Sequence, residues 1–389
     1  MAIAEQTYAF YIPSITFLGF GAHKELGKQI KALGGARKPF ICTDKGITKA
    51  GITQKIVDLI KTDPGLDSVV FDETVANPTD FNVHDGLKVY QDYGCDMIIS
   101  LGGGSAHDCA KGIGILATNG GDIRDYEGVD KTKKPMPPFI AVNTTAGTAS
   151  EMTRFCIITD TSRKVKMPII DQRVTPNVAI NDPLLMMDMP PSLTAATGMD
   201  ALTHAIEAYV STMATPITDT CALKAIALIA RYLRAAVANG HDAAARENMA
   251  YAEYLAGMAF NSAGLGHVHA MAHQLGGFYN LPHGVSNAIL LPHIERFNLI
   301  AKMDRFVDIA VAMGEKVAGM SQRAAAERAL DAMKTLAADI GIPARLRELG
   351  VKEEDLTLMA QNAQKDACSF TNPRCPSLED IVNIYKAAL

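Results

Sequence analysis

The sequence predicts an N-terminal α/β domain built on a parallel, Rossmann-like sheet and a C-terminal domain made only of helices. Two observations support this fold class. In the first half of the chain, short β-branched runs alternate with helical stretches, as in successive βαβ units. From about residue 182 onward, Ala, Leu and Met recur at helical spacing and strand-like runs nearly vanish. Prolines and a methionine-rich stretch interrupt the pattern over residues 181–190, so we expect domains over residues 1–185 and 186–389.

The elements of the first half follow in order from their patterns. Apolar and β-branched runs predict strands over residues 38–43, 68–71, 96–101 and 139–143. Helical periodicity predicts helices over residues 48–61 and 80–93, and two prolines predict a turn over residues 135–138. An extended segment over residues 9–17 precedes these elements. It has the character of an edge strand, which can add to the sheet of a second copy of the chain.

Composition excludes several classes of protein. With 389 residues, of which 48% are hydrophobic and 20% charged, the chain can fill more than one core. A formal net charge of −5 leaves no basic surface for nucleic acid. The N-terminus does not read as a signal peptide, and the longest apolar stretch, residues 222–238, contains Lys224, Arg231 and Arg234. The seven scattered cysteines form no CxxC pair, so we expect a cytoplasmic protein that binds neither membrane nor nucleic acid.

A glycine-rich loop, Gly102-Gly103-Gly104-Ser105, directly follows a predicted strand and opens a helix. Glycines allow close backbone approach, and the N–H groups of a helix start favour a phosphate. Ser105 and Asp108 also have the spacing of a capping box, so the same residues are explained by the start of a helix alone. Asp44 ends an earlier strand, where its carboxylate is placed either to bind a ribose and repel a 2′-phosphate or simply to begin a helix or form a turn.

Histidines are concentrated in one window of the second half. Five of the ten in the chain lie there: His267, His269, His273, His283 and His293. His269 and His273 are four apart on an apolar helix, and His283 lies beyond the Gly276-Gly277 break, in a turn made by Pro282 and Gly284. Several buried imidazoles repel one another when protonated and are costly when unpaired, and a bound cation resolves both problems.

Asp200 and His204 provide a second pair upstream, four residues apart on a predicted helix. Taken by itself, this pair is better explained by a surface hydrogen bond. Combined with the histidine window, it completes a set of one carboxylate and three imidazoles, with one histidine to spare. Such a set suits a divalent transition metal.

Together these motifs closely resemble those of the iron-containing, or group III, alcohol dehydrogenases. The resemblance covers nearly the whole chain and rests on residues 77–79, 102–105, 144–148, 196–204, 269–276 and 281–284. It implies an N-terminal dinucleotide-binding domain, a C-terminal metal-binding helical domain and a metal in the cleft between them. It also implies that Asp44 precedes the glycine loop in the chain, the reverse of the usual dinucleotide-binding order.

The resemblance implies a role for individual residues. The implied metal ligands are Asp200, His204, His269 and His283. His273 corresponds to a histidine that is not a ligand and lies near the reacting carbon, where it acts as a proton relay or only shapes the pocket. The implied cofactor contacts are Asp44, Asn77, Gly102, Gly103, Gly104, Ser105, Thr144, Thr145, Thr148, Thr153 and Lys166. His267 and His293 have no implied role, whereas His107, Cys109, Phe260 and Cys368 either lie near cofactor or substrate or serve packing.

The activity implied is NAD-dependent interconversion of small primary alcohols and aldehydes by hydride transfer, with Fe2+ as Lewis acid on the substrate oxygen. Zn2+ and Mn2+ suit the same ligands. Ethanol, butanol, 1,3-propanediol and lactaldehyde are not ranked by the sequence, and a homodimer or higher homo-oligomer is expected. Two alternatives are a lyase related to dehydroquinate synthase, disfavoured by the apolar surroundings of the metal motifs, and a non-catalytic nucleotide-binding protein.

Overall fold

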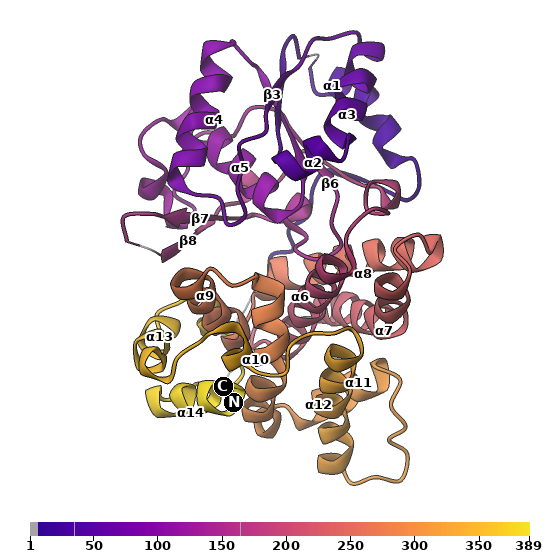
Figure 1. Ribbon diagram of the computed structural model, residues 1–389, viewed down its shortest axis with the longest axis vertical. Helices are drawn as coiled ribbons and strands as arrows, with labels where there is room; N and C mark the ends of the chain where they lie inside the picture. The colour runs from indigo at the N-terminus through magenta and orange to yellow at the C-terminus, as the bar shows by residue number, and fades with distance from the viewer. Residues whose placement is uncertain (1–6, 35, 164) are drawn as a thin grey trace. The chain divides into compact units, whose positions relative to one another are not determined.

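The computed structural model describes residues 7–34, 36–163 and 165–389 (Figure 1). The chain forms two compact units. The first, which we call the sheet unit, comprises residues 13–194 and 239–251. The second, the helical unit, comprises the described part of residues 1–12 together with residues 195–238 and 252–389. The division into folding domains at residues 185 and 186 stays a prediction.

A six-stranded, wholly parallel sheet forms the centre of the sheet unit. Its strands, in spatial order, are β1 (Ile15–Leu18), β9 (Val178–Asn181), β6 (Phe139–Asn143), β4 (Met97–Gly102), β2 (Pro39–Cys42) and β3 (Val69–Phe71). The four predicted strands are present within one or two residues of their predicted ends. Only the last part of the extended segment predicted over residues 9–17 is a strand, and β9 was not predicted.

Both faces of this sheet are buried, as the continuous apolar runs require. Successive side chains point to opposite faces, so Phe40 packs with α4 (Asp80–Asp92) and α5 (Gly104–Asn119). Its neighbour Ile41 packs with α1 (Leu26–Ala32) and α3 (Ile52–Thr62) on the other face. Figure 1 shows the two pairs of helices on opposite sides of the strands.

Two parts of the sheet unit differ from the predictions. The helix predicted over residues 48–61 is divided into α2 (Lys45–Lys49) and α3, because Gly51 adopts a left-handed conformation with φ 78°. A second, three-stranded sheet of β5 (Gly128–Val129), β8 (Val165–Ile170) and β7 (Phe155–Asp160) was not predicted. Pro168 lies inside β8, and a proline within an apolar run obscures a strand in the sequence.

The helical half was predicted correctly, because after β9 the described residues contain no strand. Its helices are α6 (Pro191–Val210), α7 (Pro216–Ala238), α8 (Ala243–Ala263), α9 (His267–Tyr279), α10 (His283–Asn298), α11 (Met303–Ala312), α12 (Gln322–Asp339), α13 (Leu356–Ala363) and α14 (Leu378–Ala388). Within the described part of the chain, no helix combines the length and apolar character needed to cross a membrane.

Candidate metal centre and dinucleotide site

The predicted cofactor residues gather at one edge of the parallel sheet. Asp44 follows β2, the glycine loop ends β4, and Thr144 and Thr145 follow β6, and these three strands are neighbours in the sheet. The carboxyl ends of parallel strands form the usual ligand-binding edge of such a sheet. A Cβ placed on Gly103 would lie 2.9 Å from the Thr145 side chain, and one on Gly104 would lie 2.9 Å from that of Thr148. The loop and the threonines are therefore in close contact.

The start of α5 differs from the capping box predicted for Ser105 and Asp108. The N-cap is Gly103, which has no side chain to accept a hydrogen bond. Asp108 instead accepts hydrogen bonds from the Ser150 hydroxyl at 2.7 Å and the Ile157 N–H at 3.2 Å. Because no side chain caps the helix, its first N–H groups and its dipole keep the character of an anion-binding site.

Asp44 is the N-cap of α2, where its Oδ1 accepts the N–H groups of Gly46 at 2.7 Å and Ile47 at 3.0 Å. Asp44 is therefore a helix N-terminal residue, which is one of the alternatives that the sequence left open. Its other oxygen, Oδ2, faces the glycine loop, since a Cβ on Gly102 would lie 3.6 Å away from it. The ribose contact of Asp44 stays a prediction that this placement permits.

The remaining predicted threonines lie on the segment after β6, Lys166 lies on the β7–β8 hairpin, and Asn77 lies between β3 and α4. Thr144 and Thr153 are buried, whereas Thr145 and Thr148 are half-buried. Lys166 on β8 pairs with Thr159 on β7, and the Thr159 hydroxyl donates to the carbonyl of Asn77 at 3.4 Å. Asn77 and Lys166 thus lie at the same hairpin.

Three helices bring the predicted metal ligands together in the helical unit. One side-chain atom each of Asp200 (α6), His269 (α9) and His283 (α10) lie within 4.8 Å of one another. Oδ1 of Asp200 is 3.8 Å from Nε2 of His269 and 3.6 Å from Nε2 of His283. Two ligands bonded to one tetrahedral metal at about 2.1 Å lie roughly 3.4 Å apart, so these separations fit a shared ion. His204, one turn after Asp200, stacks on His269 with ring centroids 4.6 Å apart.

His283 is not placed as the sequence predicted. It is the first residue of α10, with Pro282 as the N-cap, and does not lie in a turn. The predicted break at Gly276-Gly277 is also absent, because α9 continues through both glycines to Tyr279 and ends at Asn280, which is left-handed with φ 52°. A helix tolerates an interior glycine at modest cost, and asparagine readily takes the left-handed cap.

The donor set itself tests whether a metal suits this site. Nδ2 of Asn287 lies 2.7 Å from Oδ1 of Asp200, 3.2 Å from Nε2 of His269 and 3.1 Å from Nε2 of His283. An amide nitrogen carries only two protons, so it does not satisfy three converging acceptors at once. Buried carboxylate and imidazole groups that converge in this way are the chemistry that a divalent cation requires. The residues present therefore fit the metal implied by the resemblance.

Glu207 orients one of these ligands and was missed in the sequence. It is fully buried, and its Oε2 lies 2.5 Å from Nδ1 of His269. A carboxylate that accepts the Nδ1 proton leaves the Nε2 lone pair for a metal. The signal available in the sequence was its position, seven residues after Asp200 on the same helix face.

His273 belongs to a second cluster beside the predicted ligands. Its ring stacks on that of His283 with centroids 5.4 Å apart, and its Nδ1 lies 2.8 Å from Oδ2 of Asp366. Asp366, His273 and Cys368 present three potential ligand atoms close together. Burial raises the pKa of the Cys368 thiol well above its usual value, so we interpret this group as a hydrogen-bonded cluster. Asp366 was not predicted, because 93 residues separate it from His273.

The residues for which packing was weighed against a ligand contact are mostly in the core. His107 is fully buried and its Nδ1 lies 2.7 Å from the Ser100 hydroxyl, while burial lowers its pKa to about 3. Cys109 is also fully buried. Phe260 stacks on His204 with ring centroids 4.3 Å apart, next to the predicted metal ligands. His267 is buried, and burial lowers its pKa.

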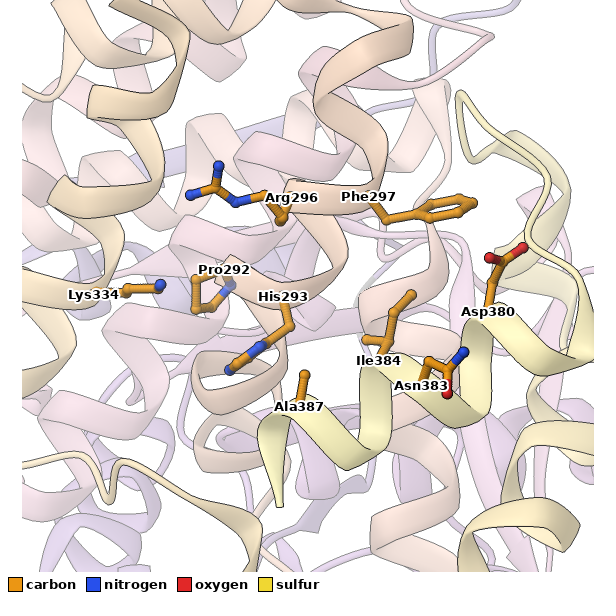
Figure 2. Close-up of a pocket in the computed structure, with 9 residues that line it drawn as sticks. All are labelled: Pro292, His293, Arg296, Phe297, Lys334, Asp380, Asn383, Ile384 and Ala387. Atoms are coloured by element: carbon orange, nitrogen blue, oxygen red, sulfur yellow. The ribbon is translucent and has the colours of Figure 1, made fainter. Parts of the chain in front are cut away.

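His293 lines a groove of about 350 Å³ in the helical unit (Figure 2). The groove is bounded by residues of α10, α12 and α14, including Lys334, Asp380 and Ile384. His293 lies ten residues after His283 on α10, which corresponds to roughly 15 Å along the helix axis. The lining residues include none of the predicted ligands, so the groove is separate from the predicted metal site.

Comparisons with known proteins match both halves of the chain. Residues 13–183 match the family model described as iron-containing alcohol dehydrogenase, and residues 194–389 match that of the C-terminal part of the Fe-containing alcohol dehydrogenase family. The chain is 54% identical to the 1,3-propanediol dehydrogenase of Citrobacter freundii, with 98% of each chain covered. It is 50% identical to the NAD-dependent methanol dehydrogenase of Bacillus methanolicus, covering 98% of this chain and 99% of that protein. A crystal structure of a 1,3-propanediol oxidoreductase superposes with a TM-score of 0.97 at 52% identity, covering 99% of this chain and 100% of that one.

Proposed function

This chain belongs to the iron-containing alcohol dehydrogenase family and is therefore an oxidoreductase, and we propose that it interconverts small primary alcohols and aldehydes with NAD as hydride carrier. The observation that carries the proposal is the convergence of Asp200, His269 and His283 on one point of the helical unit. The sheet unit contributes the glycine loop and the threonines that suit a dinucleotide. We further propose a homodimer or higher homo-oligomer in the cytoplasm.

Asp200, His204, His269 and His283 would hold the metal, for which we propose Fe2+. When bound, a divalent metal supplies Lewis acidity that favours negative charge on the substrate oxygen. Glu207 holds His269 with Nε2 directed at Asp200, so this ligand is oriented before any ion binds. The negative charge of Asp200 offsets the positive charge that the site must accept.

His273 is the residue that we propose for proton transfer. Asp366 accepts the proton on Nδ1, which leaves the Nε2 lone pair as an acceptor. In alcohol oxidation Nε2 takes up the proton of the substrate hydroxyl, and in aldehyde reduction it returns that proton. NAD supplies the hydride acceptor. Asp44, which faces the glycine loop, favours NAD over NADP because its carboxylate repels a 2′-phosphate.

The substrate class rests on the named relatives, one of which is a 1,3-propanediol dehydrogenase and another a methanol dehydrogenase. We propose that this chain likewise acts on short, unbranched primary alcohols. The apolar surroundings of the ligands favour an uncharged substrate, since Phe260 and the apolar side of α9 lie beside them.

Elemental analysis of anaerobically purified protein tests the proposal. The metal is removed and the protein is reconstituted separately with Fe2+, Zn2+ and Mn2+. NADH and NADPH absorbance is then followed with ethanol, butanol, 1,3-propanediol, lactaldehyde and their redox partners. We expect about one iron per chain, activity restored best by Fe2+ and preference for NADH. A flat trace with every metal and substrate would instead indicate a non-catalytic nucleotide-binding protein.

A further inference from the structure

A lysine with no exposed surface lies in the second turn of α5, the helix that begins at the glycine loop. The Lys111 ammonium donates to the carbonyl oxygens of Ser150 at 2.7 Å, Thr153 at 3.0 Å and Phe155 at 2.6 Å. The hydroxyls of Ser150 and Thr153 lie slightly farther away, at 3.1 and 3.3 Å. An ammonium has three protons, so each carbonyl receives one. A neutral amine has only two protons and would donate to only two of the three carbonyls.

The segment that Lys111 binds has little regular structure of its own. It connects β6 with β7, and its only helical part is the short 3₁₀ turn η3 (Ser150–Met152). Ala149, just before that turn, is left-handed with φ 51°, which is unfavourable for a residue with a Cβ. Such a conformation persists only where the surroundings hold it. Lys111 and Asp108, one turn apart on α5, restrain the backbone here. Lys111 donates to the Ser150 carbonyl, and Asp108 accepts from the Ser150 hydroxyl and from the N–H of Ile157 on β7.

The same segment carries the threonines of the dinucleotide site. Thr145 and Thr148 lie against Gly103 and Gly104, and the Thr144 N–H donates to the Gly102 carbonyl at 3.0 Å. The segment is thus joined to the glycine loop at one end and to Lys111 at the other. The first attachment is at the end of β4, and the second is on α5, which begins two residues later. The rigid length between them therefore sets the distance between the N–H groups of the glycine loop and the threonine hydroxyls.

We propose that Lys111 is a positioning residue of the cofactor site, which fixes the threonine segment relative to the glycine loop without touching the cofactor. This inference rests on the proposed function, because it requires that the edge of the sheet binds a dinucleotide. Packing alone does not account for the residue, since burying an ammonium is costly and an apolar side chain of similar length fills the same space. An apolar side chain would donate to none of the three carbonyls of Ser150, Thr153 and Phe155 that the ammonium holds together.

The test is a Lys111→Met substitution, which keeps the length of the side chain and removes its three donors. NADH binding is measured by the fluorescence of bound NADH, so no turnover is needed. We expect the dissociation constant to rise at least tenfold. In steady-state assays, KM for NAD rises by a similar factor, whereas kcat at saturating NAD changes less than threefold.

Arg246→Met is the matched control. Arg246 is a buried cation of the same unit, 1% exposed, and donates to the carbonyls of Gly240 at 2.8 Å and Met189 at 3.1 Å, away from the threonine segment. Both variants are compared by thermal unfolding. A general loss of stability would weaken NADH binding equally in both, whereas the proposed role predicts that Arg246→Met stays within twofold of the wild type.

A folded Lys111→Met protein that binds NADH as tightly as the wild type would overturn the inference and leave the proposed function intact. If Lys111→Met does not fold, the inference is tested with Ser150→Ala, because this change removes the hydroxyl that bridges Lys111 and Asp108. We expect about threefold weaker NADH binding, and unchanged binding overturns the inference. Absence of NADH binding by the wild-type protein overturns both the inference and the proposed cofactor.

Discussion

Glu207 and Asp366 each face Nδ1 of a histidine, and in this way they decide what the other ring nitrogen does. In the proposed function, His269 thereby offers Nε2 as a metal ligand and His273 offers Nε2 as a proton acceptor. Both carboxylates lie far along the chain from the histidine they orient, 62 residues in one case and 93 in the other. The chemistry of the two imidazoles therefore depends on residues that no local motif contains.

Replacement of Glu207 by Gln tests the orientation of His269. The amide no longer carries the charge that supports Nδ1 protonation, so we expect about 10- to 100-fold weaker metal binding, the usual cost of losing such a partner. Competition with a metal-sensitive chelator measures the affinity. Glu295→Gln is the control, because Glu295 is equally buried but its Oε2 contacts Asn298 rather than a predicted ligand. Equal effects of the two substitutions would argue against the assignment.

His107 provides a second prediction at this scale. Burial holds its pKa at about 3, whereas an unfolded histidine has a pKa of about 6.5. Below pH 6.5 the His107 side chain therefore binds a proton in the unfolded chain but not in the folded chain. The free energy of unfolding consequently falls as the pH falls towards 3. The wild-type protein therefore loses free energy of unfolding between pH 7 and pH 5, and we expect His107→Asn to reduce this loss by about 2 kcal/mol.

Denaturant unfolding at the two pH values measures this difference. Asparagine retains a hydrogen-bonding group for Ser100 but does not titrate. His241→Asn, at an exposed position, serves as the control and should keep the wild-type dependence. If His107→Asn lost as much free energy of unfolding between the two pH values as the wild type, His107 would not be the cause of the pH dependence.

At the scale of elements, the convergence of the predicted metal ligands depends on how closely α10 approaches α6. A Cβ on Gly284, in the first turn of α10, would lie 2.1 Å from the carbonyl oxygen of Ala196 on α6. Backbone does not yield as a flexible side chain does, so only glycine permits this contact. The approach brings His283 of α10 to within 3.6 Å of Asp200 on α6. Gly284 thus allows α10 to pack close enough to α6 for the predicted ligands His283 and Asp200 to meet.

Gly284→Ala is therefore expected to force the start of α10 away from α6. Overpacking of this kind typically costs about 1–3 kcal/mol of stability. We expect metal affinity to fall at least tenfold as well, because one of the ligands moves. Gly86→Ala is a suitable control, since its Cβ would meet the Ile113 side chain at 2.4 Å in the sheet unit. It should lower stability and leave the metal content, measured by elemental analysis, unchanged.

At the scale of the whole molecule, the predicted metal ligands lie in the helical unit and the sheet edge proposed to bind the dinucleotide lies in the sheet unit. A ligand that binds only the folded state stabilises it by mass action, by about 4 kcal/mol at a thousandfold excess over its Kd. We therefore expect metal binding to stabilise the helical unit and NADH binding to stabilise the sheet unit. The two effects can be separated by removing one ligand at a time.

Chelation of the metal is expected to lower the unfolding temperature and abolish turnover while NADH still binds. Differential scanning calorimetry with and without Fe2+ and fluorescence titration with NADH measure the two properties. His269→Ala supplies the control, because it lacks a ligand and should show no stabilisation by Fe2+. Stabilisation of this variant to the wild-type extent would contradict the assignment of His269.

The sequence by itself determined the order of the elements and the nature of the reactive groups. Periodicity predicts the parallel strands and the helical half, because burial on both faces of a sheet or on one face of a helix leaves a local pattern. Spacing placed Asp200 with His204 on one helix and marked the glycine loop at the end of a strand. The residues at helix ends were less well predicted. His283, Asp108 and the Gly276-Gly277 pair all differ from expectation, since caps depend on what packs against the helix end.

Only the tertiary structure decided which of these groups meet. The contacts of Glu207 with His269, Asp366 with His273 and Lys111 with the threonine segment all join residues at least 39 positions apart. Such contacts arise from the packing of whole elements, and they leave no periodicity in the sequence because each involves one side chain. The same holds for Gly284, whose necessity is apparent only from the carbonyl of Ala196 beside it. The sequence thus identifies the chemistry, and the packing of helices and strands sets its geometry.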